Sequence, residues 1–214
     1  MELNQNKVSV EALTSALLAR KTTRHAFKWS LSIGQAHNLL TAAYIAEVQY
    51  RRREYRETQN LKNAISQIAG HLVGDSTRFG LMLCGLPGNG KTTMLYAIRS
   101  ANAYLNHGNI SVTIIDAKDY ARRCKDIAWT DSAKAMPVLA LEDIGREPME
   151  VVDFGNIINP IVDCLEYRYN EQLPTIITTN LTPAELREKY GARIADRFNE
   201  MMNVVVFNDS SFRV

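Results

Sequence analysis

Eight residues near the middle of the chain have the types and spacing of a phosphate-binding loop. They match GxxxxGK[ST] and run Gly85, Leu86, Pro87, Gly88, Asn89, Gly90, Lys91 and Thr92. The glycines let successive backbone N–H groups turn inward around an anion, because no Cβ atom stands in the way. Lys91 supplies a point charge for the β- and γ-phosphates, and the Thr92 hydroxyl is a ligand for Mg²⁺. We therefore expect this segment, with Thr93, to bind a nucleotide and Mg²⁺.

A chance glycine turn is the alternative, and the surrounding pattern argues against it. An apolar strand at 79–84 precedes the loop and a helix at 91–107 follows it, which is the context that the motif requires. A second apolar strand, at 138–141, ends in Glu142 and Asp143. Ligands of open parallel sheets bind at the carboxyl ends of the strands. We expect Glu142 to hold Mg²⁺, partly through water, and Asp143 to orient or deprotonate the attacking water. A surface acidic pair is the competing interpretation.

A third polar side chain is predicted at the same edge of the sheet. The strand at 174–179 (PTIITT) is followed by Asn180, whose amide can touch a γ-phosphate or the attacking water. Asn180 as an ordinary turn residue before Leu181-Thr182-Pro183 remains an alternative.

The pattern along the chain changes near residue 60. Before it the sequence indicates helices only, at 8–20 and from Ser32 onward, where Gln35 completes a capping box. After it short apolar strands alternate with helices, which predicts βαβ units and a mostly parallel sheet. The further strands are expected at 111–116 and 203–207, and the further helices at 61–73, 118–125, 154–170 and 182–191. This predicts an α/β fold, a three-layer α/β/α P-loop NTPase with a five-stranded sheet over 60–214, preceded by a small helical module over 1–59.

Composition excludes several classes of protein. A 46% apolar and 22% charged chain is typical of a globular protein, and no apolar run approaches the roughly 20 residues that span a bilayer. The N-terminus lacks the features of a secretory signal. Three dispersed cysteines argue against a disulfide framework or a zinc site, so we expect a cytoplasmic protein. The formal net charge of +2 means that nucleic-acid binding needs local basic clusters.

The order of these motifs resembles a known family. The loop, the strand ending in Glu142-Asp143-Ile144-Gly145, the strand ending in Thr178-Thr179-Asn180 and the segment 191–198 (GARIADRF) resemble the AAA+ ATPases of the DnaC/IstB group. These proteins are replicative-helicase loaders and ATP-dependent transposition helpers. The resemblance covers about residues 60–213 and implies ATP as the nucleotide, since no guanine-specifying NKxD motif occurs. It also implies that no large C-terminal lid is present.

The resemblance implies roles for four polar residues. Asn180 is similar to the sensor I residue, Arg197 with Arg193 to the arginine finger, and Arg213 to the sensor II arginine. A finger reaches the γ-phosphate of a neighbouring subunit, which implies a homo-oligomer in the active state. Arg193 and Arg197 as salt-bridge residues on a helix surface is the alternative. The Glu142–Asp143 order departs from the Asp-Glu or Asp-Asp of the family, so slow hydrolysis is expected.

Two basic clusters lie outside these motifs. Lys118, Tyr120, Arg122 and Arg123 combine charge with an aromatic ring, as in grooves that bind single-stranded DNA, although a solvated helix face is equally compatible. Arg51-Arg52-Arg53 with Arg56 closes a helix, where cations are favourable in any case. We favour that explanation for the second cluster.

The sequence is compatible with three functions. The leading one is an ATPase that acts in DNA replication as a DnaC-like helicase loader, assembles on single-stranded DNA and holds a helicase through its N-terminal helices. The second is an IstB-like transposition helper that binds duplex DNA. The third is a nucleotide-gated adaptor that scarcely hydrolyses ATP.

Overall fold

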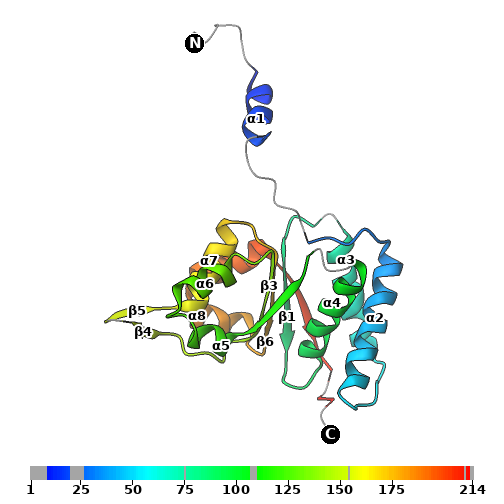
Figure 1. Ribbon diagram of the computed structural model, residues 1–214. Helices are drawn as coiled ribbons and strands as arrows, with labels where there is room; N and C mark the ends of the chain where they lie inside the picture. The colour runs from blue at the N-terminus through cyan, green and yellow to red at the C-terminus, as the bar shows by residue number, and fades with distance from the viewer. Residues whose placement is uncertain are drawn as a thin grey trace.

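The computed structural model describes residues 9–19, 27–74, 76–106, 110–153, 155–209 and 211–212 (Figure 1). Its centre is a five-stranded sheet in the order β2-β3-β6-β1-β7, with every neighbouring pair parallel. The strands are β1 (Gly80–Gly85), β2 (Val112–Asp116), β3 (Val138–Ile144), β6 (Thr175–Thr179) and β7 (Met202–Phe207). The predicted number of strands and their parallel arrangement are therefore confirmed.

Helices cover both faces of this sheet, as the predicted three-layer fold requires (Figure 1). One apolar cluster joins one face to α2 (Ile33–Tyr50), α3 (Gln59–Val73) and α4 (Lys91–Asn106). A second joins the other face to α5 (Ala117–Arg122), α6 (Ile127–Lys134), α7 (Pro160–Asn170) and α8 (Pro183–Met201). Helix α1 (Val10–Ala19) has no buried residue. No described helix has the length and apolarity to span a lipid bilayer.

Helix α2 packs within the same core as the helices that follow residue 60. Its buried residues Ala36, Leu40 and Tyr44 belong to the cluster that contains the core residues of α3 and α4. The capping box at Ser32 is present, with Gln35 N–H donating to Ser32 Oγ at 3.2 Å. The predicted domain boundary near residue 60 stays a prediction, but the apolar core continues across it.

The predicted helix at 154–170 is wrong over its first turns. Helix α7 begins at Pro160, because Asn159 caps it and proline suits the first helical position. The preceding residues form an antiparallel hairpin of β4 (Val151–Asp153) and β5 (Asn156–Ile158). Each strand has only three residues, too few for an alternating pattern to be recognised. Helix α6 is likewise absent from the sequence-based prediction.

Helix α8 consists of two segments that meet at Gly191. The predicted start at Thr182, with its capping box to Glu185, is present. At Gly191 the backbone adopts φ 83° and ψ 163°, a positive φ that favours glycine, and the helix then resumes to Met201. Arg193 and Arg197 lie on the second segment. The break at Gly191 allows this segment to take a direction different from that of the first segment.

Candidate nucleotide-binding site

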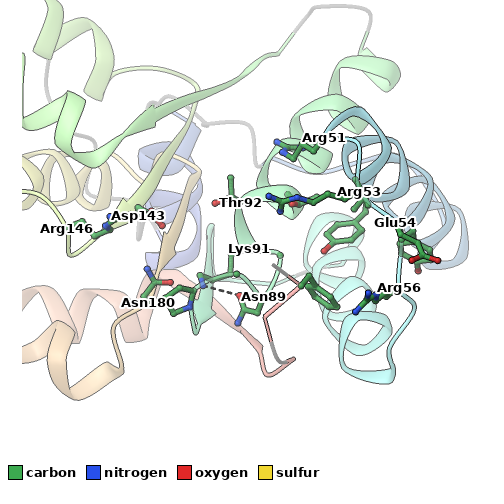
Figure 2. Close-up of a pocket in the computed structure, with 18 residues that line it drawn as sticks. Arg51, Arg53, Glu54, Arg56, Asn89, Lys91, Thr92, Asp143, Arg146 and Asn180 are labelled. Carbon is green, nitrogen blue, oxygen red and sulfur yellow. Dashed lines mark hydrogen bonds and ion pairs between the residues drawn. The ribbon is translucent and has the colours of Figure 1, made fainter. Parts of the chain in front are cut away.

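A cleft of about 420 Å³ opens at the carboxyl edge of the sheet (Figure 2). It is bounded by the loop after β1, the ends of β3 and β6, the C-terminal part of α2 with the turn after it, and the C-terminal tail. The lining residues are Tyr44, Val48, Arg51, Arg53, Glu54, Tyr55, Arg56, Pro87, Gly88, Asn89, Gly90, Lys91, Thr92, Thr93, Asp143, Arg146, Asn180 and Phe212. The cleft therefore brings together the predicted loop and two of the three polar residues expected opposite it.

The phosphate-binding loop is held in shape by its own lysine. Lys91 is buried, and its Nζ donates to the carbonyl oxygens of Gly85 at 2.6 Å and Leu86 at 2.8 Å. It also lies 3.1 Å from Asn89 Oδ1, the contact drawn as a dashed line in Figure 2. Helix α4 begins at Lys91, so its free N–H groups and positive dipole end face the loop.

Two glycines of the loop are required by their conformation and neighbours. Gly85 has φ 139° and Gly90 has φ 97°. A Cβ atom at Gly85 would lie 2.3 Å from the Phe207 carbonyl oxygen, and one at Gly90 would lie 2.3 Å from the Tyr44 hydroxyl. The glycine spacing thus permits both the inward turn of the loop and its close approach to β7 and α2.

Thr92 and Glu142 form a pair of oxygen donors beside the loop. The Thr92 hydroxyl hydrogen-bonds the Glu142 carboxylate, which is half-buried. Burial raises the pKa of Glu142, the Thr92 hydrogen bond opposes that rise, and the neighbouring carboxylates of Asp143 and Asp116 add to it. A cluster of repelling carboxylates next to a hydroxyl fits a small divalent cation with oxygen ligands, such as Mg²⁺. The donor set is therefore compatible with the predicted metal site.

Asp143 is placed in the cleft by an irregularity in β3. The register between β3 and β6 shifts between Leu141 and Ile144, and Asp143 adopts φ 56°, which aspartate tolerates better than most residues. Its backbone N–H donates to Thr178 Oγ1 at 2.8 Å. Its carboxylate pairs with Arg146 at 3.0 Å, a partner that the sequence did not indicate.

Asn180 lies across the cleft from the turn that follows α2, as Figure 2 shows. It directly follows β6, and Thr179 Oγ1 donates to the Ile144 carbonyl oxygen at 2.9 Å. This bond ties the ends of β6 and β3 together. The position expected for Asn180 agrees with the structure, while its role in catalysis stays a prediction.

Arg193 and Arg197 do not line the cleft. Both contact one carboxylate on α7: Arg193 Nη2 lies 2.9 Å from Glu166 Oε2, and Arg197 Nη1 lies 2.9 Å from Glu166 Oε1. The Arg197 side chain is 15% exposed against 69% for Arg193, and its guanidinium also stands over the Tyr169 ring. Within one chain these contacts match the salt-bridge alternative.

The C-terminal tail returns to the loop. The Phe212 N–H donates to the Gly88 carbonyl oxygen at 3.0 Å, and the Asp209 carboxylate accepts from Thr58 Oγ1 at 2.8 Å. Arg213, predicted as the sensor II arginine, lies outside the described residues.

Arg122 and Arg123 of the first basic cluster line a separate depression, and the contact predicted for Tyr120 is wrong. Tyr120 is fully buried and packs on Trp129 with ring centroids 5.4 Å apart, so its ring cannot stack on a base in this structure. Arg122 pairs with Asp119, and the Arg123 guanidinium lies 3.9 Å from the Trp129 ring centroid. Lys118, Arg122 and Arg123 are exposed. Their charge is available to a ligand, although the aromatic ring is not.

The α2 side of the cleft is the part that sequence reasoning missed. Arg51, Arg53 and Arg56, which the sequence alone explains as cations at a helix end, line the cleft together with Tyr44 and Tyr55. These residues lie between 29 and 41 positions before the first residue of the loop, Gly85. The run of arginines was a visible signal, but a helix C-terminus explained it equally well.

Comparison with known proteins agrees with the motif order. No protein-family model matches the chain. The chain is 31% identical over 118 residues to the replicative helicase loader DnaI of Bacillus subtilis (strain 168). The matched stretch is 52% of this chain but only 36% of that loader, so most of the loader has no counterpart in the alignment.

Solved structures give the same picture for the fold. The crystal structure of DnaI has a TM-score of 0.55 and 28% identity, over 75% of this chain and 87% of that one. The crystal structure of the DnaC helicase loader has a TM-score of 0.58 and 24% identity, over 72% and 94%. DnaA bound to AMPPCP and single-stranded DNA has a TM-score of 0.54 and 18% identity, over 73% and 49%. The chain therefore resembles DnaC-like AAA+ helicase loaders, as predicted, and its α/β fold is that of their AAA+ domains.

Proposed function

We propose that this chain binds ATP with Mg²⁺, hydrolyses it slowly, and acts in DNA replication as a DnaC-like helicase loader. The main observation in its support is that one edge of the sheet brings together Lys91, the Thr92–Glu142 pair, Asp143 and Asn180. The similarity to DnaI and DnaC supports the helicase-loader part of the proposal.

Each residue of the site has a distinct task in this proposal. The loop N–H groups bind the phosphates, and Lys91 exchanges the carbonyl oxygens of Gly85 and Leu86 for phosphate oxygens. Thr92 and Glu142 hold Mg²⁺, which when bound offsets the negative charge of the phosphates. Asp143 and Asn180 orient the attacking water.

The same geometry gives a reason for slow turnover. Asp143 has a shorter side chain than glutamate, and its carboxylate is engaged by Arg146 at 3.0 Å. To accept a proton from water, the carboxylate has to give up its contact with Arg146. Arg146→Gln should therefore raise the turnover of ATP if Asp143 is the base, and lower it if Arg146 itself contacts the nucleotide.

A trans-acting finger is part of the proposal. Arg197 is held by Glu166 and Tyr169 within its own chain, so reaching a neighbour's γ-phosphate requires exchanging these contacts. The test is steady-state ATP turnover of the wild type and Arg197→Ala, alone and with single-stranded or duplex DNA. A finger in trans predicts that the mutant loses turnover. It also predicts recovery when the mutant is mixed with Lys91→Ala subunits, which retain Arg197. Turnover that is unchanged in Arg197→Ala would remove the finger from the mechanism.

The kind of DNA that stimulates ATP turnover distinguishes a helicase loader from a transposition helper. Lys118, Arg122 and Arg123 offer exposed charge for a phosphate backbone. Stimulation of turnover by single-stranded DNA supports the loader, and stimulation by duplex alone supports the transposition helper. Tight ATP binding without turnover under any condition would leave a nucleotide-gated adaptor.

Helix α1 is the proposed attachment point for a replicative helicase. Val10, Leu13 and Leu17 are exposed and follow helical spacing, so they can form an apolar stripe for a partner. A pull-down with a DnaB-type helicase should lose the partner in Leu13→Glu/Leu17→Glu. The matched control is Ser15→Glu, which adds charge to the other side of the same helix. Equal retention by all three proteins would exclude α1 as the contact.

A further inference from the structure

The C-terminal turn of α2 has an unusual conformation for its sequence. Arg52 follows the helix with φ 55°, the left-handed position that glycine normally takes at a helix end. Its N–H donates to the Gln49 carbonyl oxygen at 2.8 Å, and the Arg53 N–H donates to that of Val48 at 3.1 Å. This pair of bonds closes the helix as a Schellman motif. The resulting turn puts Arg51 and Arg53 on the lining of the cleft, whereas Arg52 is exposed and does not line it.

This turn is anchored to the phosphate-binding loop and to its helix. The Tyr44 hydroxyl lies against Gly90, as shown by the 2.3 Å to a Cβ built there. Arg51 pairs with Glu47 at 2.6 Å, and the other oxygen of Glu47 accepts from Ser100 Oγ on α4 at 2.8 Å. The arginines therefore have a defined position relative to Lys91 and Thr92.

The lining of the cleft carries an excess of positive charge. It includes five cations, Arg51, Arg53, Arg56, Lys91 and Arg146, and only two carboxylates, Glu54 and Asp143. Arg51 is paired with Glu47 and Arg146 with Asp143. By contrast, the Arg53 side chain makes neither an ion pair nor a hydrogen bond with any residue in the described ranges. In Figure 2 it extends toward Thr92.

A guanidinium that extends into a cleft beside a phosphate-binding loop is suited to an anionic ligand, because its planar fork matches two oxygens of a phosphate. We infer that Arg53 is a phosphate-binding residue of the nucleotide site, contributed by the same chain from the α2 side. Its direction toward Thr92 assigns it to the β- and γ-phosphates rather than to the base. The inference rests on the proposed binding of ATP. It also makes the turn between α2 and α3 a part of the nucleotide site, and ATP should hold this turn more firmly than ADP does.

The test is calorimetric titration of MgATP and MgADP into the wild type, Arg53→Gln and Arg52→Gln. Arg52→Gln is the matched control, because it removes the same charge from the adjacent residue that does not line the cleft. We expect Arg53→Gln to weaken MgATP about tenfold and MgADP about threefold, and Arg52→Gln to change either by less than about twofold. Arg53→Lys keeps the charge but loses the fork, and should fall between the wild type and Arg53→Gln.

The outcomes separate this inference from the proposed function. If the wild type binds MgATP and Arg53→Gln binds it like Arg52→Gln, the inference fails while ATP binding stands. If the wild type does not bind MgATP, both fail. Equal losses for MgATP and MgADP would overturn the assignment to the terminal phosphate. Weaker binding of a fluorescent single-stranded oligonucleotide by Arg53→Gln, with unchanged MgATP affinity, would overturn it in favour of a nucleic-acid contact. Circular dichroism melting of each variant provides the folding control, and Arg53→Lys keeps the test valid if Arg53→Gln does not fold.

Discussion

The two walls of the nucleotide cleft differ in how the chain builds them. One wall is a single stretch from Pro87 to Thr93, in which consecutive residues supply the lining groups. The other consists of Tyr44, Arg51, Arg53 and their neighbours, which reach the cleft only because α2 packs on α4. A wall built from consecutive residues (the local wall) can be recognised as a sequence motif. A wall assembled by helix packing can be recognised only in the folded chain.

Removing the central cation of the local wall should have the largest effect. Lys91→Ala loses the buried ammonium group that the phosphates need, so MgATP affinity should fall by roughly a hundredfold or more. Titration calorimetry measures it, with Lys134→Ala on α6 as a control for loss of a lysine. If Arg53→Gln has the larger effect, the α2 wall rather than the loop dominates phosphate binding.

The point where the two walls touch is Gly90. Gly90→Ala places a Cβ atom 2.3 Å from the Tyr44 hydroxyl and forces alanine to φ 97°, so the free energy of unfolding should fall by about 2–3 kcal/mol. Adding Tyr44→Phe removes the clashing oxygen but leaves the unfavourable φ and the ring carbon at 3.4 Å. Urea denaturation should show a partial recovery in the double variant, with Tyr44→Phe alone as the reference. An absence of recovery would mean that backbone strain, and not contact between the walls, causes the loss.

The acid beside the local wall should respond to pH. Burial raises the pKa of Glu142 in the folded protein, so ionisation of Glu142 opposes folding. This cost grows as the pH rises from the ordinary pKa of glutamate to the raised one, and it is complete above the raised pKa. Glutamine resembles the protonated form. In the absence of Mg²⁺, Glu142→Gln should therefore raise the Tm by roughly 1–3 °C near pH 8, with a gain that shrinks as the pH falls through the raised pKa. Melting curves from pH 4 to 8 measure it. A gain independent of pH would point to packing rather than charge.

Loosening the α2 wall at its surface should have the smallest effect. Glu47→Gln removes the ion pair with Arg51 and weakens the link to Ser100, and a partly exposed pair of this kind contributes about 0.5 kcal/mol. Urea denaturation at low and high salt measures it, with Glu54→Gln as the control, since both residues lie near the same turn. A loss above about 2 kcal/mol would show that this pair, and not the apolar contact of α2 with α4, positions the wall.

The sequence predicted most of the elements that carry the local wall. The strand before the loop and the helix after it agree with β1 and α4 to within a residue or two, and Glu142, Asp143 and Asn180 lie at the ends of the expected strands. These predictions succeeded because burial on both faces of a parallel sheet produces apolar runs with clear ends. The hairpin β4–β5 was not predicted, because three-residue strands have too few positions to show an alternating pattern.

Side-chain orientation was less predictable than element position. Tyr120 lies among basic residues in the sequence, yet the short helix α5 turns it into the core against Trp129. Arg122 at the end of this helix and Arg123, which caps it, are exposed. Adjacent residues on a helix point about 100° apart, so proximity in sequence does not mean a shared surface.

The phosphate-binding loop can be recognised from the sequence alone, because glycines, a lysine and a threonine at that spacing meet a local requirement of backbone geometry and charge. The sequence also determined the sheet edge that presents the acids. The folded structure was needed to show that Arg51 and Arg53 line the same cleft as that loop and that Glu166 pairs with both Arg193 and Arg197. Those contacts depend on how separate helices pack, and the burial of apolar area drives that packing whichever polar residues it brings together.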